Sequence, residues 1–159
     1  IRPISSNNES KYAQMAAEVE SLEVDKLLGS AFYQDVVDNP DEYADLLGEY
    51  EFTRADQTTI KHRGLRYVIA YLNYSKYIGE SYITDSFSGM VQKLRPDSEH
   101  ISSGDIKRLQ QQYREIAFNA FNLIREFLDL NKDTYTLWDC NSDKKMRRPN
   151  FYSLKNTET

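Results

Sequence analysis

The sequence predicts an all-α fold: a small helical bundle with two long central helices, a long inserted loop and an extended C-terminal tail. Two observations carry this prediction. Apolar residues recur with a helical period over 61–79 and over 105–130, and a length of 159 residues suits a single domain with its own core. We therefore expect an N-terminal arm at 1–8, a helical domain at 9–130 with its long loop at 81–104, and a docking tail at 131–159.

The first of the long helices, over 61–79, has an apolar face on both sides. At about 100° per residue, one face carries Leu65, Val68, Ile69 and Leu72, and the nearly opposite face carries Tyr67, Tyr71, Tyr74 and Ile78. A helix with two apolar faces should pack against two separate surfaces at once. The tyrosines suit a contact with another protein, because the ring is buried while the hydroxyl keeps a polar partner. A central core helix whose hydroxyls reach the domain surface is the alternative.

The first 48 residues predict three shorter helices. One begins at Glu9, and a second begins after Ser21 as its cap. This second helix ends at Asn39, because the residue before Pro40 is pushed out of the α region. A short helix led by this proline then ends at Gly48.

Two segments have no helical period. Residues 49–60 are polar, and we expect a loop there. Residues 80–104 form a connection of about 25 residues, and connections of that length are usually functional. Within it, Tyr82, Ile83, Phe87, Met90 and Val91 could form short strands or a hairpin. We expect a binding loop, with Phe87 and Met90 among its contact residues.

The second long helix is the clearest element of the sequence. Ser102, with Asp105 three residues later, resembles a capping box. One apolar stripe then continues for roughly 39 Å. Its members are Ile106, Leu109, Tyr113, Ile116, Ala117, Ala120, Ile124, Phe127 and Leu128, and Phe118 and Phe121 lie on its flank.

The tail from Asn131 cannot form a core by itself. Its aromatic residues, which include Trp138, are separated by polar stretches, so they must dock onto this domain or onto another chain. It also holds a basic cluster of Lys144, Lys145, Arg147 and Arg148. This cluster could contact phosphates, bind an acidic protein surface or remain solvated. Of the two binding roles we favour protein docking, because the first half of the chain is acidic.

The net charge of −5 hides a division along the chain. Residues 1–60 hold 4 Lys and Arg against 13 Asp and Glu, and residues 61–159 hold 16 against 12. The resulting charges of −9 and +4 attract each other, either within one fold or between neighbouring copies arranged head to tail. A simple nucleic-acid binder would usually be basic overall.

The sequence predicts neither an enzyme nor a metal or cofactor site. His62, His100 and Cys140 are too few and too far apart for a usual zinc site, and we expect a surface or capping role for each histidine. Asp129 begins a stretch that resembles a calcium loop, but position six is Thr134 rather than glycine. The single cysteine suits a reducing compartment, and the lack of a hydrophobic run of spanning length predicts a soluble chain with no membrane contact.

The order of several short motifs resembles a known family. These motifs are Lys26-Leu27-Leu28-Gly29 followed by Phe32-Tyr33, then Leu46-Leu47, Gly64-Leu65, the tyrosines Tyr71, Tyr74 and Tyr77, and Phe87-Ser88-Gly89 before a long last helix. Over residues 9–138, this order is similar to that of the head-tail connector (adaptor) proteins of tailed bacteriophages. The resemblance is to the form carried by phages and prophages of gut Bacteroidales, including the neck ring proteins of crAss-like phages.

The resemblance implies a structural protein of the virion neck that assembles in the host cytoplasm. It implies a ring of twelve copies that binds the portal protein and the next neck or tail protein, and that extends the channel through which DNA passes without sequence-specific contact. In that family the C-terminal segment reaches into the portal and the long loop contacts neighbouring subunits. The alternative is a helical adaptor or regulatory domain of a bacterial cell that binds one protein partner. A metal-dependent hydrolase would be a third class of protein, but no motif in the sequence indicates one.

Overall fold

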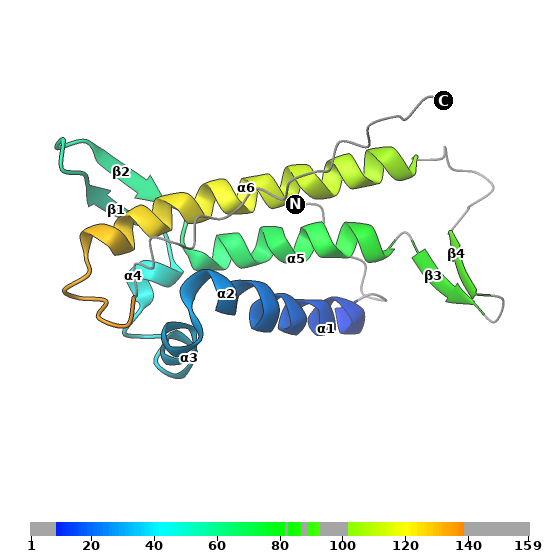
Figure 1. Ribbon diagram of the computed structural model, residues 1–159, viewed down its shortest axis with the longest axis horizontal. Helices are drawn as coiled ribbons and strands as arrows, with labels where there is room; N and C mark the ends of the chain where they lie inside the picture. The colour runs from blue at the N-terminus through cyan, green and yellow to red at the C-terminus, as the bar shows by residue number, and fades with distance from the viewer. Residues whose placement is uncertain (1–8, 82, 87–88, 93–101, 139–159) are drawn as a thin grey trace, which may run out of the picture.

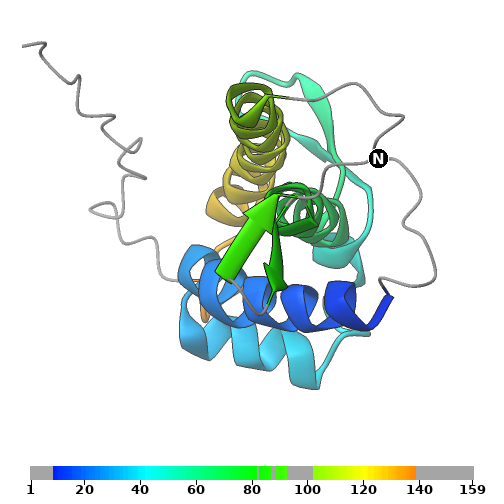
Figure 2. The same cartoon turned by 90° about the vertical axis from the view of Figure 1, so that its right-hand side faces the viewer.

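The computed structural model describes residues 9–81, 83–86, 89–92 and 102–138 of the chain. The helices lie in layers (Figures 1 and 2): α6 (Ser103–Leu130) packs on α5 (Leu65–Ser81), and α5 packs on α1 (Glu9–Val19). α5 and α6 make the most extensive contact between any two elements, as the sequence predicts for its two long helices. The fold is therefore mostly helical. It is not confirmed as all-α, because two antiparallel hairpins accompany the helices.

The first helix does not break at Ser21, so this predicted cap is wrong. α1 continues through a π-helical turn, η2 (Glu20–Val24), into α2 (Asp25–Leu28), and the Ser21 hydroxyl donates to the carbonyl of Glu18 inside the helix. The continuous helix buries Val19, Val24 and Leu28 in one row. The chain turns instead at Gly29, where φ is +89°, a conformation that favours glycine.

The next two helices end where the sequence predicts. α3 (Ser30–Asp38) stops just before Asn39, and α4 (Ala44–Leu47) is followed by Gly48. α3 buries Phe32 and Val36, and α4 buries Leu46. These side chains join the core that lies beneath the N-terminal half of α5.

A β-hairpin replaces the loop predicted over 49–60. Strand β1 (Tyr50–Thr53) pairs with β2 (Thr59–His62), with Tyr50 opposite His62. The predicted helix start at Lys61 is also wrong, because β2 occupies that position and α5 begins at Leu65. The hairpin turn has its positive φ, +66°, at Gln57, so it lacks the glycine or asparagine that would signal a turn.

His62 anchors this hairpin to the rest of the core and has no exposed surface, contrary to the expected surface or capping role. Its ring centroid lies 4.9 Å from that of Phe127 and 6.0 Å from that of Phe52. The amide of Gly64 donates to Nδ1 over 3.1 Å, so the neutral ring carries its proton on Nε2. Burial lowers the pKa of His62, and the nearby carboxylate of Asp45 opposes that effect.

The second hairpin lies at the opposite end of the long helices (Figure 1). Strand β3 (Ile83–Ser86) pairs with β4 (Gly89–Gln92), within the segment where the sequence predicts a possible hairpin. Met90 faces Asp85 in the register, and Phe87 lies outside the described residues. This segment separates α5 from α6 in the chain, and the two helices still meet side by side.

The buried row of α6 differs in part from the predicted stripe. Its buried members are Ile106, Ala117, Phe121, Ile124, Phe127 and Leu128. Leu109 is 39% exposed, and Phe121 belongs to the core rather than to the flank. The two halves of α6 have different neighbours: β2 contacts the helix near its C-terminal end, whereas Gln110 in the N-terminal half meets Ser75 of α5. α6 therefore buries more side chains toward its C-terminal end than toward its N-terminal end.

Replacing Ile124 by Ala should lower the free energy of unfolding by about 2 to 5 kcal/mol, because the side chain is fully buried and leaves a cavity. Ile116→Ala is the matched control, since Ile116 is only half-buried and should lose less. Urea unfolding with unchanged m-values measures both. Equal losses for the two variants would contradict the observed position of the buried row.

The stability of the protein should fall as the pH drops below about 6.5. The unfolded chain protonates His62 near pH 6.5, whereas burial keeps the folded side chain neutral to lower pH. The unfolded state thus binds more protons, and the free energy of unfolding decreases by up to about 1.4 kcal/mol per pH unit.

Urea unfolding between about pH 7 and pH 5, where histidine is the main titrating side chain, tests this expectation. His62→Phe should flatten the slope, and His100→Gln, which alters the other histidine of the chain, should leave it unchanged. A slope that persists in His62→Phe would exclude His62 as its source.

Candidate interaction surfaces

The three tyrosines predicted on the second face of α5 lie in one continuous row of aromatic rings, which we call the tyrosine strip. Its members are Tyr67, Tyr71, Tyr74 and Tyr77 of α5, Tyr113 of α6 and Tyr12 of α1. Neighbouring centroids are 4.5 Å apart for Tyr67 and Tyr71 and 4.9 Å for Tyr74 and Tyr113. Tyr12 reaches Tyr77 over 6.0 Å. Side chains from three helices therefore form one surface.

The tyrosine strip is partly used within the fold. Tyr74 is only 6% exposed, and Tyr113 lies against both Tyr71 and Tyr74. The position of Tyr74 thus agrees with the alternative of a core helix whose tyrosines pack within their own domain. Tyr67 and Tyr71 remain half-buried and keep part of each ring at the surface. The apolar stripe of α6 predicts a core position for Tyr113 but not its place in this row, because the contact depends on the rotation of α6 against α5.

Cationic side chains flank the Tyr67 end of the strip. The guanidinium of Arg63 lies 5.8 Å from the Tyr67 ring centroid, a cation–π distance. Arg66 is exposed in the first turns of α5. A hydrogen bond with Tyr67, together with burial, raises the pKa of Tyr71, so the Tyr71 hydroxyl stays neutral at physiological pH. Arg63 also pairs with Glu49 at 3.2 Å, so this end of the strip offers aromatic surface together with positive charge that is partly neutralised.

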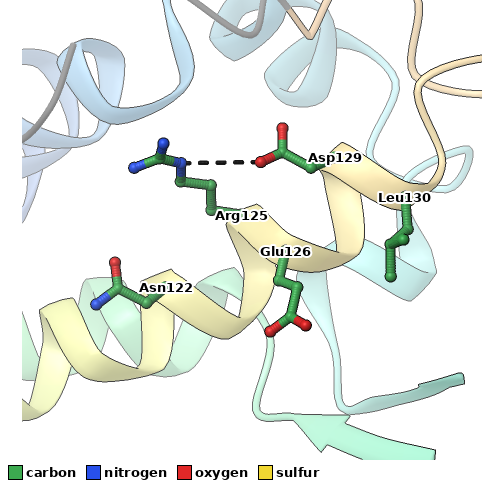
Figure 3. A pocket seen from close by; sticks show the side chains of 5 residues that line it. All are labelled: Asn122, Arg125, Glu126, Asp129 and Leu130. Atoms are coloured by element: carbon green, nitrogen blue, oxygen red, sulfur yellow. Dashed lines mark ion pairs between the residues drawn. The ribbon is translucent and has the colours of Figure 1, made fainter. Parts of the chain in front are cut away.

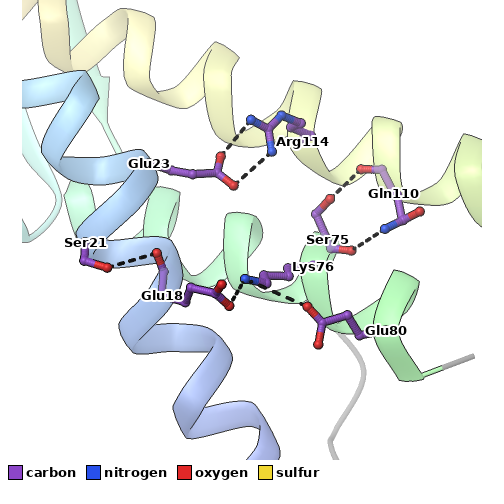
Figure 4. A network of polar contacts seen from close by, with 8 residues as sticks. All are labelled: Glu18, Ser21, Glu23, Ser75, Lys76, Glu80, Gln110 and Arg114. Carbon is purple, nitrogen blue, oxygen red and sulfur yellow. Dashed lines mark hydrogen bonds and ion pairs between the residues drawn. The ribbon is translucent and has the colours of Figure 1, made fainter. Parts of the chain in front are cut away.

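Several acidic residues of the first half meet basic residues of the second half within the molecule. Figure 4 shows Glu18 paired with Lys76 of α5, and Glu23 paired with Arg114 of α6 at 2.8 Å. Glu49 pairs with Lys61 at 2.7 Å. The division of charge along the sequence is thus partly neutralised inside one fold, which is one of the two outcomes that the sequence left open.

A second group of carboxylates has no basic partner within the described residues. Residues 27–48 contain no Lys or Arg and five acidic side chains, which we call the acidic lobe: Asp35, Asp38, Asp41, Glu42 and Asp45. Their contacts are with neutral groups. The hydroxyl of Tyr43 donates to Asp35, and burial together with this bond raises the pKa of Tyr43 to about 12. The amide of Gln34 donates to Asp38 over 3.0 Å.

Trp138, expected to contact a partner or the domain itself, lies in the core of its own domain and is 9% exposed. Its ring centroid is 6.0 Å from that of Phe32 in α3, and its indole N–H donates to Asp129 over 2.9 Å. Tyr135 is also buried and stacks on Tyr43. The first part of the predicted tail therefore closes the C-terminal end of α6 onto α3.

The remaining predicted contact residues are not placed. Phe87 and the basic cluster (Lys144, Lys145, Arg147 and Arg148) lie outside the described residues. Met90 is described only as a backbone position of β4. Of the predicted set, the structure brings together Tyr67, Tyr71 and Tyr74, and it separates them from Trp138.

The outer face of the end of α6 has an open hollow (Figure 3), lined by Asn122, Arg125, Glu126, Asp129 and Leu130. The charged side chains that line the hollow form ion pairs with neighbouring residues. Arg125 lies 3.9 Å from Asp129, and Glu126 pairs with Arg54, which follows β1. The charged residues of the hollow therefore make contacts that hold the folded domain together.

No three His, Cys, Asp or Glu side chains in the described segments come together in a way that could hold a metal ion. Among the helices of those same segments, none combines the length and the apolar character needed to cross a membrane.

The fold and these surfaces define a small, mostly helical domain that presents a partly exposed aromatic strip and an acidic lobe. A family model matches residues 24–148, and the chain belongs to that family, a family of unknown function (DUF6712). No curated protein and no solved structure matches the chain.

Replacing Asp129 by Ala should lower the free energy of unfolding by about 1 to 3 kcal/mol, because the buried indole N–H of Trp138 loses its acceptor. Trp138 is the only tryptophan, so its fluorescence reports this site directly. We expect a red-shifted emission in the folded variant. Asp129→Asn keeps an acceptor and should stay near the wild type; identical spectra for all three proteins would contradict the placement of Trp138.

Proposed function

We propose that this chain is a structural protein of the virion neck, which forms a closed ring of twelve copies between the portal and the next neck or tail protein. The order of motifs that supports this proposal runs through the whole described domain, from α1 to Trp138. In this role the protein extends the DNA channel without reading sequence, and it assembles in the host cytoplasm.

The observation that carries the proposal is the tyrosine strip with Arg63 and Arg66 beside it. Aromatic and arginine side chains are enriched at protein interfaces and dominate their binding energy. The exposed parts of Tyr67 and Tyr71 offer such a contact on the surface of α5. A neighbouring copy is the partner that the proposal requires.

The acidic lobe supplies the complementary surface. A closed ring needs two different surfaces on each copy, because a contact between identical patches stops at a dimer. The strip is built mainly on α5 and α6, whereas the lobe is built on α3 and α4, and Figure 2 shows α3 in the layer farthest from α6. The carboxylates of one copy would face Arg63 and Arg66 of the next. Charge then sets the orientation of the contact, and the aromatic rings supply most of its strength.

A single-partner adaptor domain remains the second candidate. The observation that favours it is the internal use of the strip, in which Tyr74 and Tyr113 pack on each other and Tyr74 is buried. An adaptor needs only the remaining surface of Tyr67 and Tyr71 for one partner. The mass of the protein in solution and negative-stain electron microscopy separate the candidates. Closed rings support the connector, and a monomer at every concentration supports the adaptor.

Tyr67→Ala should weaken the ring by at least about 1 kcal/mol per interface, because the side chain is a half-exposed aromatic next to a cation. Mass photometry over a dilution series measures the dissociation. Leu130→Ala is the control, since this side chain is 46% exposed and is not a member of the tyrosine strip. Its rings should dissociate like those of the wild type. Thermal unfolding confirms that both variants remain folded. Equal ring stability in Tyr67→Ala and the wild type would remove the strip from the interface.

A further inference from the structure

The outer side of α3 is a helix face that nothing in the described part of the chain covers. Val37 is 52% exposed, and Gln34 and Asp38 are exposed beside it. Asp41 and Glu42 follow directly and are exposed as well. The inner side of the same helix is fully occupied by the core. The outer face is thus an acidic surface with one apolar side chain near its centre.

The charges of this face distinguish it from the rest of the acidic half. Glu18, Glu23 and Glu49 each meet a lysine or arginine of the second half. The five carboxylates of the acidic lobe form no ion pair within the described residues. Concentrated like charges destabilise a compact fold by self-repulsion, and a basic segment placed against them relieves that cost.

The path of the chain brings a basic segment to this face. The described residues end at Trp138, which is held against Phe32 of α3 and hydrogen-bonded to Asp129. Tyr135, three residues earlier, stacks on Tyr43, whose hydroxyl donates to Asp35 of the acidic lobe. The chain therefore leaves the domain beside α3.

Lys144 follows Trp138 by six positions, and a connection of that length spans at most roughly 20 Å when extended. It is the first member of the basic cluster completed by Lys145, Arg147 and Arg148. We infer that this cluster binds the acidic outer face of α3 in the same molecule. A tether this short holds the two charged segments at an effective concentration on the order of millimolar, so the segment of the same molecule outcompetes that of another copy in the free subunit.

We infer the contact between the basic cluster and the α3 face for the free subunit. The inference does not depend on whether copies form rings. Where rings form, the tail segment and the neighbouring copy compete for the same acidic lobe. The tail would then leave this face during assembly.

A spin label beyond the basic cluster tests the inference. A nitroxide is attached at Asn150→Cys in a Cys140→Ser background, and paramagnetic broadening of the backbone amide signals is recorded in dilute full-length protein. At ~10 mM salt, where the Debye length is about 30 Å, the amides of residues 34–42 should lose their signals. At ~1 M salt, where it is about 3 Å, the broadening of these amides should fall to the level found for the rest of the surface around Trp138.

Charge variants with a matched control complete the test. Neutralising the α3 face by Asp38→Asn, Asp41→Asn and Glu42→Gln should restore the signals at low salt. The control neutralises three exposed carboxylates elsewhere, with Glu51→Gln, Asp56→Asn and Glu115→Gln, and should keep the broadening. A solvated tail would broaden the surface around Trp138 evenly, with no response to salt or to either variant, and this result would overturn the inference. Broadening that appears only between labelled and unlabelled molecules would assign the face to a second copy and would also overturn it.

Discussion

The fold depends on the burial of α5 on more than one side. Leu65, Val68 and Leu72 enter the core with α3, while the next faces of the helix receive α1 and α6. Gly79 leaves room for the side chain of Gln110 in α6, because a Cβ at this position would lie 1.9 Å from the side-chain amide nitrogen of Gln110. Figure 4 shows Gln110 and Ser75 exchanging two hydrogen bonds at the same crossing. α1, α4, α6 and β3 all contact this helix, and the tyrosine strip is the part of its surface that the neighbours leave partly open.

The sequence predicts the elements whose signal is local. Helical periodicity finds α5 and α6, Pro40 and Gly48 mark helix ends, and Ser102 accepts the amide of Asp105 as a cap. The β1–β2 hairpin escapes prediction because its turn lacks glycine and because few of its side chains are buried. His62 is missed for a related reason. Its burial depends on Phe52 and Phe127, and no pattern of neighbouring residues reveals contacts that form only when distant segments meet.

The same distinction applies to the candidate surfaces. The spacing of Tyr67, Tyr71 and Tyr74 on one side of a helix is a local property, and the structure keeps them together. Their burial is not local, because it depends on where Tyr113 of α6 lies. The charge division behaves in the same way. Sequence counts show that the two halves attract, but only the packing decides that Glu18 and Glu23 meet basic partners while the acidic lobe meets none among the described residues.

Residues of both candidate surfaces contact other residues of the same molecule, and both surfaces also remain partly exposed. The rings of the strip contact each other, so a neighbouring copy would add contacts to side chains that already hold one another and would lose little side-chain freedom on binding. The acidic lobe behaves differently if the basic cluster covers it, because a neighbour must then displace a tethered competitor. Association would strengthen only after the tail moves, since the apparent affinity equals the intrinsic affinity multiplied by the fraction of lobes that the tail leaves free. A protein that must stay monomeric until its docking platform is present gains from this arrangement, because the platform can shift the balance by binding the displaced tail.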